Sequence, residues 1–137
     1  MTPRELLNQA LDLILAKDMS GFADLWAADG TMEFPFAPPG WPGRLDGREA
    51  VREYLRDYTD AFDVKTVTER AVHETTDPEV IIAEIEIDGV LVRTGRPYER
   101  RYISVLTVRD GHIADYRDYW SPVGMTTDTD FTRPDDV

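Results

Sequence analysis

Residues 112–122 read His-Ile-Ala-Asp-Tyr-Arg-Asp-Tyr-Trp-Ser-Pro, a stretch rich in aromatic and branched side chains. A turn signal at Asp110-Gly111 precedes it and Ser121-Pro122 ends it, as is typical of a β-strand. Side chains alternate across a strand, so one face is predicted to hold Ala114, Tyr116, Asp118 and Trp120. A carboxylate between two large aromatic side chains is typical of a pocket wall. A salt-bridged Asp118 in an ordinary core fits the same residues.

The length of 137 residues suits one domain that buries roughly two-thirds of its unfolded surface. The formal net charge of −12 argues against nucleic acid and against an anionic membrane surface as partners. No apolar run approaches the roughly 20 residues of a membrane span, and no signal-peptide pattern stands at the start. Since there is also no cysteine, we expect a cytoplasmic location without disulfides or thiolate metal sites.

The first third of the chain predicts two helices and a strand. A first helix follows the Thr2 cap, because apolar residues recur at helical spacing from Leu6 to Ile14. A second, short helix is expected from Ser20 to the turn at Asp29-Gly30, carrying Phe22, Leu25 and Trp26. Residues 31–36 then read as a strand on which Glu33 faces inward.

A loop rich in proline and glycine covers residues 37–46, where neither helix nor strand is expected. We predict that Trp41 in this loop rims an opening. A third helix should begin at Gly47, because Asp46 and Glu49 stand at capping-box spacing.

Strand patterns fill the rest of the chain at residues 64–76, 80–92 and 98–109. In residues 80–92 one face is apolar and the other carries Glu84, Glu86 and Asp88, which favours a solvated face over a metal site. The strand at 98–109 is partly apolar on both faces and needs cover on both, so we predict a homodimer through the outer face of the sheet. Residues 124–137 read as a tail, either loose or pinned by Phe131.

Helices followed by long strands of a mostly antiparallel sheet predict an α+β domain. Long twisted strands curl, and three N-terminal helices can close only one end of such a sheet. A concave interior with a pocket is therefore expected.

Three segments together resemble the NTF2-like superfamily, and its SnoaL-like branch most of all. They are Leu-Trp-Ala-Ala-Asp-Gly-Thr-Met-Glu-Phe-Pro at 25–35, Gly-Arg-Glu-Ala-Val-Arg-Glu-Tyr-Leu at 47–55, and the strand at 110–120. Residues 73–78 and 95–98 are similar to the phenazine-biosynthesis A/B pattern, and the branch also includes polyketide cyclases. The resemblance implies a cone-shaped, curved sheet wrapped on the helices, a single domain over 1–123, and usually a dimer built through the sheet.

The resemblance also implies a catalytic role for Asp118. In related limonene epoxide hydrolases the matching aspartate is catalytic, and phenazine A/B-type proteins place a glutamate there. Other family residues are absent: Ile85 and Ile87 stand where the epoxide hydrolases carry Arg-x-Asp, and Phe34 stands where ketosteroid isomerases carry their base. Epoxide hydrolysis would therefore require a non-standard site.

The predicted site combines two acids with an apolar wall. Burial raises the pKa of a carboxyl group toward neutrality, so Asp118 and Glu33 are predicted to divide acid and base roles. The predicted substrate-binding residues are Tyr102, Tyr116, Trp120, Tyr58, Phe62, Ile85, Ile87, Arg100 and Trp41. Among these, Tyr102 and Tyr116 are expected to donate hydrogen bonds, while Arg100 fits an ion pair with Asp118, a subsite for an acidic substrate, or a salt bridge at the rim.

No phosphate loop, nucleophile elbow or metal-binding histidine spacing is present, so we expect neither cofactor nor metal. The sequence predicts a cofactor-independent isomerase, cyclase or dehydratase that acts on a small apolar cyclic or polyketide-like carbonyl compound. One alternative is a protein of the same fold that binds such a ligand without catalysis, and another is an epoxide hydrolase with a non-standard site.

Overall fold

The computed structural model describes residues 1–121, so the predicted tail at 124–137, with Phe131, lies outside the described residues. Its elements, in chain order, are α1 (Pro3–Leu15), α2 (Met19–Ala23), β1 (Trp26–Glu33), β2 (Arg44–Asp46), α3 (Arg48–Leu55), α4 (Tyr58–Ala61), β3 (Phe62–Glu74), β4 (Val80–Leu91), β5 (Pro97–Arg109) and β6 (His112–Tyr119). The six strands form one sheet in the order β2-β1-β6-β5-β4-β3. Within the described residues, every helix is too short or too polar to cross a lipid bilayer.

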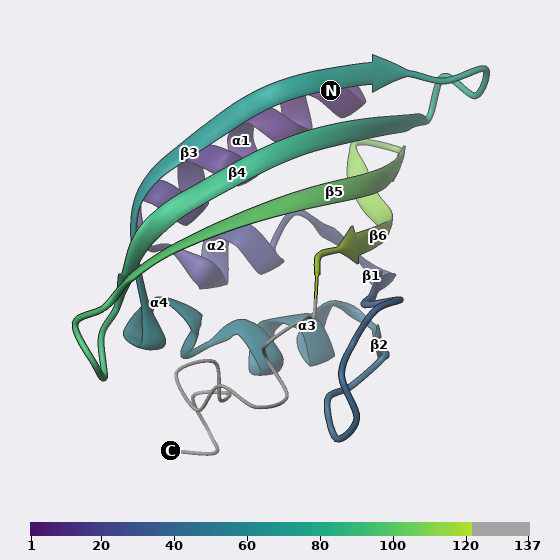
Figure 1. Cartoon of the computed structure of the whole chain (residues 1–137). Coiled ribbons are helices and arrows are strands. Elements are labelled where there is room, and N and C mark those ends of the chain that lie inside the picture. Colours follow the sequence, from purple (N-terminus) through teal and green to yellow (C-terminus); the bar gives the residue numbers. More distant parts are fainter. Residues whose placement is uncertain (122–137) are drawn as a thin grey trace.

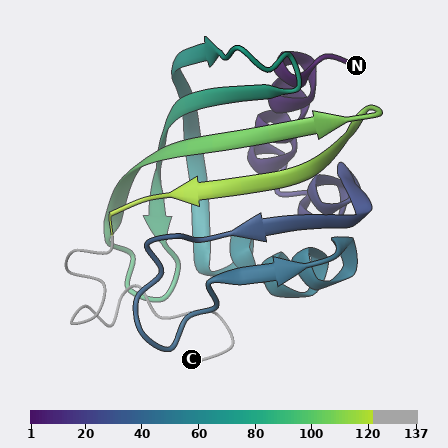
Figure 2. The ribbon, with the colours of Figure 1, turned by 90° about the vertical axis from the view of Figure 1, so that its right-hand side faces the viewer.

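The long strands β3, β4 and β5 bend together and arch over α1 (Figure 1). The helices α3 and α4 lie below the concave face, at the end opposite the arch, and β1 and β2 continue the sheet beside β6 (Figure 2). The predicted α+β arrangement, with helices on the concave side of a curved sheet, is confirmed.

The core lies between α1 and the inward face of the sheet. Leu7 of α1 and Ala83 of β4 are fully buried, as the periodicity of each segment predicts. The predicted cap is present, because the Thr2 side chain accepts a hydrogen bond from the Glu5 backbone N–H at 3.1 Å. Leu15, the last residue of α1, is 41% exposed and lies outside this core.

The region after Phe22 was predicted as helix up to Gly30, and this is wrong, because β1 already begins at Trp26. Residues from Trp26 onward form a strand because they pair with a distant segment: β1 runs parallel to β6, with Trp26 opposite Ile113. The Ile113 N–H donates to the Leu25 carbonyl at 2.8 Å. The sheet is therefore mixed, with one parallel pair among antiparallel ones.

The end of the proline- and glycine-rich loop also differs from the prediction. Residues 44–46 form β2, which pairs antiparallel with β1, although no strand was expected there. The third helix is capped by Gly47, at φ 94°, so the predicted capping box of Asp46 and Glu49 does not form. The Gly47 N–H instead donates to the carbonyl of Gly30 at 2.8 Å, which fixes the helix start against β1.

A bulge at Ala114 changes which residues of β6 face the core. Thr107 pairs with Asp115 and Val108 with Ile113, so Ala114 is the extra residue. Ile113 is fully buried where the simple alternation predicted Ala114. Beyond the bulge the alternation holds, and Tyr116 and Asp118 face inward as predicted.

Gly30 is needed because the backbones of β1 and β6 approach closely there. A methyl group at this position would lie 2.5 Å from the Ile113 carbonyl oxygen. We expect Gly30→Ala to lower the free energy of unfolding by about 1–3 kcal/mol, since backbone must move to make room. The matched control is Gly43→Ala, whose methyl group meets nothing within 4 Å. Urea denaturation of both variants checks this, and equal stability would contradict the close-approach argument.

Candidate active site

A cavity of about 140 Å³ lies between the concave face of the sheet and the helices. All nine predicted substrate-binding residues line it, together with Asp118: Trp41, Tyr58, Phe62, Ile85, Ile87, Arg100, Tyr102, Tyr116 and Trp120. The walls are mostly apolar and aromatic, as expected for a pocket that holds a small organic molecule.

Asp118 projects from β6 into this cavity. Its Oδ1 atom is shielded from solvent and has no hydrogen-bond partner in the described part of the chain, although the residue keeps some accessible surface. Burial raises the pKa of Asp118 to about 7, and the nearby positive charge of Arg100 opposes part of that rise. An acid that is about half ionised near pH 7 can both accept and donate a proton.

Three tyrosine hydroxyls form a chain beside Asp118. The hydroxyl oxygens of Tyr58 and Tyr98 lie 3.3 Å apart, and Tyr58 also shares a hydrogen bond with Tyr102. When Tyr98 donates to Tyr58 and Tyr58 to Tyr102, the Tyr102 hydroxyl keeps its own proton for a ligand. Burial raises the pKa of Tyr58 and of Tyr102 well above the ordinary value, so both remain protonated donors.

Tyr116 has a different environment from the one predicted. Its hydroxyl and the Ser104 Oγ atom are 3.1 Å apart, and both residues are buried. Its ring stacks on Trp26 at 5.6 Å between centroids. Because that hydroxyl already has a buried partner, Tyr116 is better suited to holding β6 against β5 than to binding substrate.

Arg100 and two tryptophans lie together along the cavity wall. The guanidinium carbon of Arg100 is 5.9 Å from the centroid of the Trp120 ring, at cation–π distance. Trp41 meets Trp120 edge to face at 6.2 Å, so the loop between β1 and β2 does reach the cavity, as predicted.

The inward placement predicted for Glu33 is wrong. Its neighbours Met32 and Phe34 line the cavity, so Glu33 projects from the opposite face of β1. There its carboxylate is 3.4 Å from a guanidinium nitrogen of Arg44. Partial burial, followed by the charge of Asp115, raises its pKa. The error arose from choosing the wrong inward face of the strand, since the apolar residues Met32 and Phe34 face the cavity.

Two polar residues of the cavity escaped the sequence analysis as site residues. Tyr98 and Ser104 lie on the same face of β5 as Tyr102, at even spacing, and both line the cavity. Strand alternation would have placed both residues on this face. Only the fold shows that the hydroxyl of Tyr98 meets that of Tyr58, which lies on α4.

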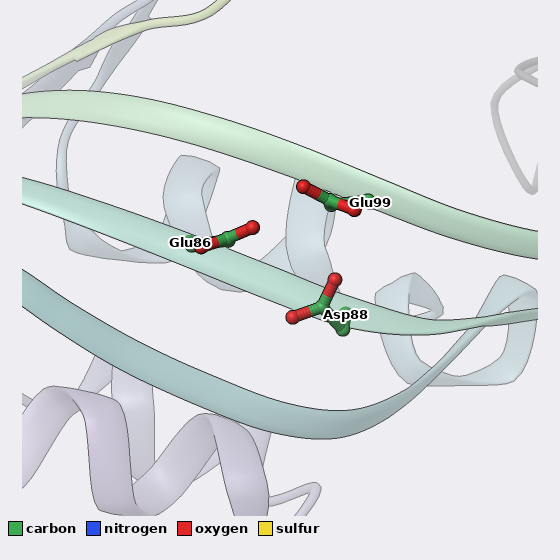
Figure 3. A group of neighbouring side chains, drawn as sticks. All are labelled: Glu86, Asp88 and Glu99. Carbon is green, nitrogen blue, oxygen red and sulfur yellow. The ribbon is translucent and has the colours of Figure 1, made fainter.

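An acidic cluster on β4 and β5 comprises Glu86, Asp88 and Glu99, whose carboxylates turn toward one another (Figure 3). One oxygen of each lies within 4.8 Å of the others, which suits a hard cation such as Ca²⁺ in principle. The negative charge of Glu86, the buried residue of the three, is already compensated, because Glu86 forms an ion pair with Arg70 and a hydrogen bond with Glu99. We therefore treat the cluster as a polar network and not as a metal site.

Glu99 is the member of this cluster with an unfavourable charge. Its hydrogen bond with Glu86, and then the negative charges of Glu86 and Asp88, raise its pKa. A raised carboxyl pKa means that stability is lost as the pH rises through the folded-state value. We expect Glu99→Gln to raise Tm at pH 8 more than at pH 4, with exposed Glu53→Gln as control. An equal effect of Glu99→Gln at both pH values, measured calorimetrically, would contradict the repulsion.

Comparison with protein families and sequences identifies known proteins that this chain resembles. The model of the SnoaL-like domain matches residues 7–116. The uncharacterized protein YesE of Bacillus subtilis is 40% identical over 119 residues, which cover 87% of this chain and 81% of YesE. The uncharacterized PhzA/B-like protein PA3332 of Pseudomonas aeruginosa is 40% identical over 123 residues, which cover 90% of this chain and 86% of that protein.

Solved structures show the same fold. The structure of a candidate isomerase from Bacillus subtilis has a TM-score of 0.88 and 36% identity, covering 95% of this chain and 94% of that one. RV0760c of Mycobacterium tuberculosis, solved with estradiol-17beta-hemisuccinate, has a TM-score of 0.75 and 22% identity, covering 88% and 95%. The fold resemblance read from the sequence is confirmed.

Proposed function

This chain belongs to the SnoaL-like domain family, and from that premise we propose that it catalyses proton transfer on a small cyclic carbonyl compound, as an isomerase, cyclase or dehydratase without a cofactor. The observation that supports this most is the single acid in an aromatic cavity, Asp118, with a pKa of about 7 and an Oδ1 atom without a partner in residues 1–121. A general base works best when its pKa lies near the working pH.

The proposed step is enolisation. The Asp118 carboxylate takes the proton from the carbon next to the carbonyl group, and the electrons of that C–H bond move to the carbonyl oxygen. The Tyr102 hydroxyl, supported by the tyrosine chain, donates a hydrogen bond to the developing enolate. The proton held by Asp118 then returns to another carbon, which gives an isomer. Alternatively, the enolate carbon attacks a second carbonyl group, which closes a ring, and the new alkoxide takes the proton from Asp118.

The direct test is exchange of α-protons. A panel of single-ring ketones is incubated with the protein in D₂O, and loss of each α-proton signal is followed by NMR. We expect enzyme-dependent exchange for at least one compound whose ring fits the cavity. If no compound exchanges faster with protein than with buffer, while binding is seen, the catalytic proposal is contradicted.

A binding protein of the same fold is the second candidate. It is favoured by the outward position of Glu33, which leaves Asp118 as the one acid among the described cavity-lining residues. Epoxide hydrolysis is not proposed, because Ile85 and Ile87 line the cavity without any second acid from residues 1–121 to orient a water molecule.

We also propose that the protein is a homodimer through the outer face of the sheet. That face carries Ile103 and, nearby, Phe36, which are 46% and 55% exposed. Both border a groove of about 570 Å³ that also contains the cations Arg70 and Arg101 and the anion Glu84. A patch with both charge signs and an apolar centre is suited to pairing with its own copy across a two-fold axis.

The dimer predicts a clear mass change on substitution. Sedimentation equilibrium at micromolar concentration should give twice the mass of the chain, and Ile103→Glu should shift it to the monomer, because a buried unpaired charge is costly. Val92→Glu is the control, since Val92 is 55% exposed in the turn after β4. A wild-type monomer, or dimer loss in both variants, would contradict this interface.

Residues 1–123 as one domain and a cytoplasmic location remain predictions from the sequence. The single domain agrees with a cavity that α1, α4 and the sheet build together.

A further inference from the structure

The loop between β1 and β2 connects the cavity with the outer face of the sheet. β1 and β6 run parallel, so both end on the same side of the sheet, and the loop leaves β1 at that side (Figure 2). Aromatic ring pairs join the loop to the end of β6. Phe36 meets Tyr119 edge to face at 5.3 Å between centroids, and Trp41 meets Trp120 at 6.2 Å.

The ring pairs lie on different sides of the sheet. Phe36 and Tyr119 border the outer groove, whereas Trp41 lines the cavity. Trp120 lines both, because it comes directly after the last residue of β6 and stands between the groove and the cavity. A molecule that packs on Phe36 in the groove is therefore separated from the cavity by the loop and by Trp120.

Side-chain contacts with β6 position the tip of this loop. The Phe34 N–H donates to the Gly43 carbonyl at 2.8 Å and closes the base of the loop. Nearer the tip, the Trp41 N–H donates to the Pro38 carbonyl at 3.1 Å, which is a bond inside the loop. Phe36 rests on Tyr119 and is 55% exposed, so cover from the outside would hold the loop more firmly.

We infer that a second copy of the chain, seated in the outer groove, packs on Phe36 and thereby holds Trp41 and Trp120 against the cavity, so that the dimer binds a cavity ligand more tightly than the monomer does. This inference rests on the homodimer proposed above, which supplies the occupant of the groove, and it makes the cavity complete only in the dimer. Coupling between two sites typically changes affinity by about 5-fold to 150-fold.

Coupling of this kind acts in both directions. A ligand that prefers the dimer must also strengthen the dimer, and each dimer has one cavity in each of its two chains. A tenfold difference in ligand affinity would therefore tighten dimerisation by about a hundredfold when both cavities are filled.

The probe is acetophenone, a neutral single-ring ketone, because the cavity of about 140 Å³ is close to the roughly 150 Å³ of an engineered cavity that holds benzene. The chain has three tryptophans, so labelling with fluorotryptophan gives three fluorine NMR signals, with fully buried Trp26 as the reference. We expect the Trp41 signal to differ between the wild-type dimer and the Ile103→Glu monomer before ligand is added. Titration of that signal should give an acetophenone Kd at least about fivefold higher for the monomer.

Phe36→Ala tests the contact without removing the dimer. At concentrations where sedimentation shows a dimer, this variant should bind acetophenone as weakly as Ile103→Glu does. In the Ile103→Glu background the same change should alter affinity by about twofold or less, the usual limit of additivity. Val92→Ala is the matched control, since Val92 is also 55% exposed but borders neither groove nor cavity, and it should keep both the dimer and the affinity.

The outcomes separate this inference from the proposals on which it builds. Equal acetophenone affinity in dimer and monomer, or equal loss from Phe36→Ala in both backgrounds, overturns the inference and leaves the dimer intact. An unchanged Trp41 signal, or no acetophenone binding to the dimer, overturns it as well, and a monomeric wild type overturns both. Tighter binding by the dimer without α-proton exchange would support the inference and contradict the catalytic proposal.

Discussion

Asp118→Asn is expected to reduce enzyme-dependent α-proton exchange by about a hundredfold or more, the usual scale of lost acid–base catalysis. Asparagine keeps the shape of the side chain and cannot accept the proton. In the wild type, exchange should increase with pH through about 7, because the ionised Asp118 is the base. Wild-type exchange in the variant, measured by NMR in D₂O, would show that Asp118 is not the base.

The same variant should be more stable than the wild type at pH 8. The pKa of Asp118 is raised from an ordinary 3.8 to about 7, so its ionisation costs folding free energy as the pH rises through this interval. The gain should be about 1–3 kcal/mol at pH 8 and should largely vanish by pH 4, where the wild-type group is protonated. Unfolding of the variant at neutral pH would mean that the carboxylate holds the fold together, which contradicts a site role.

Tyr102→Phe should give the second largest loss of exchange, about tenfold to a hundredfold. It removes the donor at the cavity end of the tyrosine chain, and loss of one donor to a developing oxyanion costs up to about a thousandfold in enzymes. The KM should change less than kcat, because the hydrogen bond strengthens as the enolate forms.

Tyr116→Phe is the matched control for the Tyr102 variant. Both tyrosines line the cavity, but the Tyr116 hydroxyl is paired with Ser104. This control should lose about 1 kcal/mol of stability, the usual value of a buried hydrogen bond, and keep most of its exchange activity. If both variants lose activity equally, the tyrosine chain has no special role as donor.

The strand pattern of β6, together with the family resemblance, predicted Asp118 as the acid of the cavity. Alternation placed Tyr116, Asp118 and Trp120 on one face, and the structure has all three on the cavity wall. The same reasoning predicted Ile85 and Ile87 on β4, because an apolar face of period two has one way to pack. These are local properties, and the sequence carries them directly.

Glu33 shows where local reasoning failed. In a strand a shift of one residue exchanges the two faces, and the pairing of Met32 with Tyr116 of the distant β6, which turns Met32 inward and Glu33 outward, is not visible in the local sequence. The start of β1 at Trp26 likewise depends on parallel pairing with β6, because Trp26 lies opposite Ile113, more than 80 residues further along the chain.

The sequence by itself determined the α+β class, the inward face of β4 and the candidate base Asp118, because periodicity and motif reside in neighbouring residues. Only the tertiary structure decided the pKa of that base, the chain of hydroxyls from Tyr98 through Tyr58 to Tyr102, and the outward position of Glu33. Burial and hydrogen bonding depend on which distant segments the sheet and helices bring together, and strand alternation does not encode that.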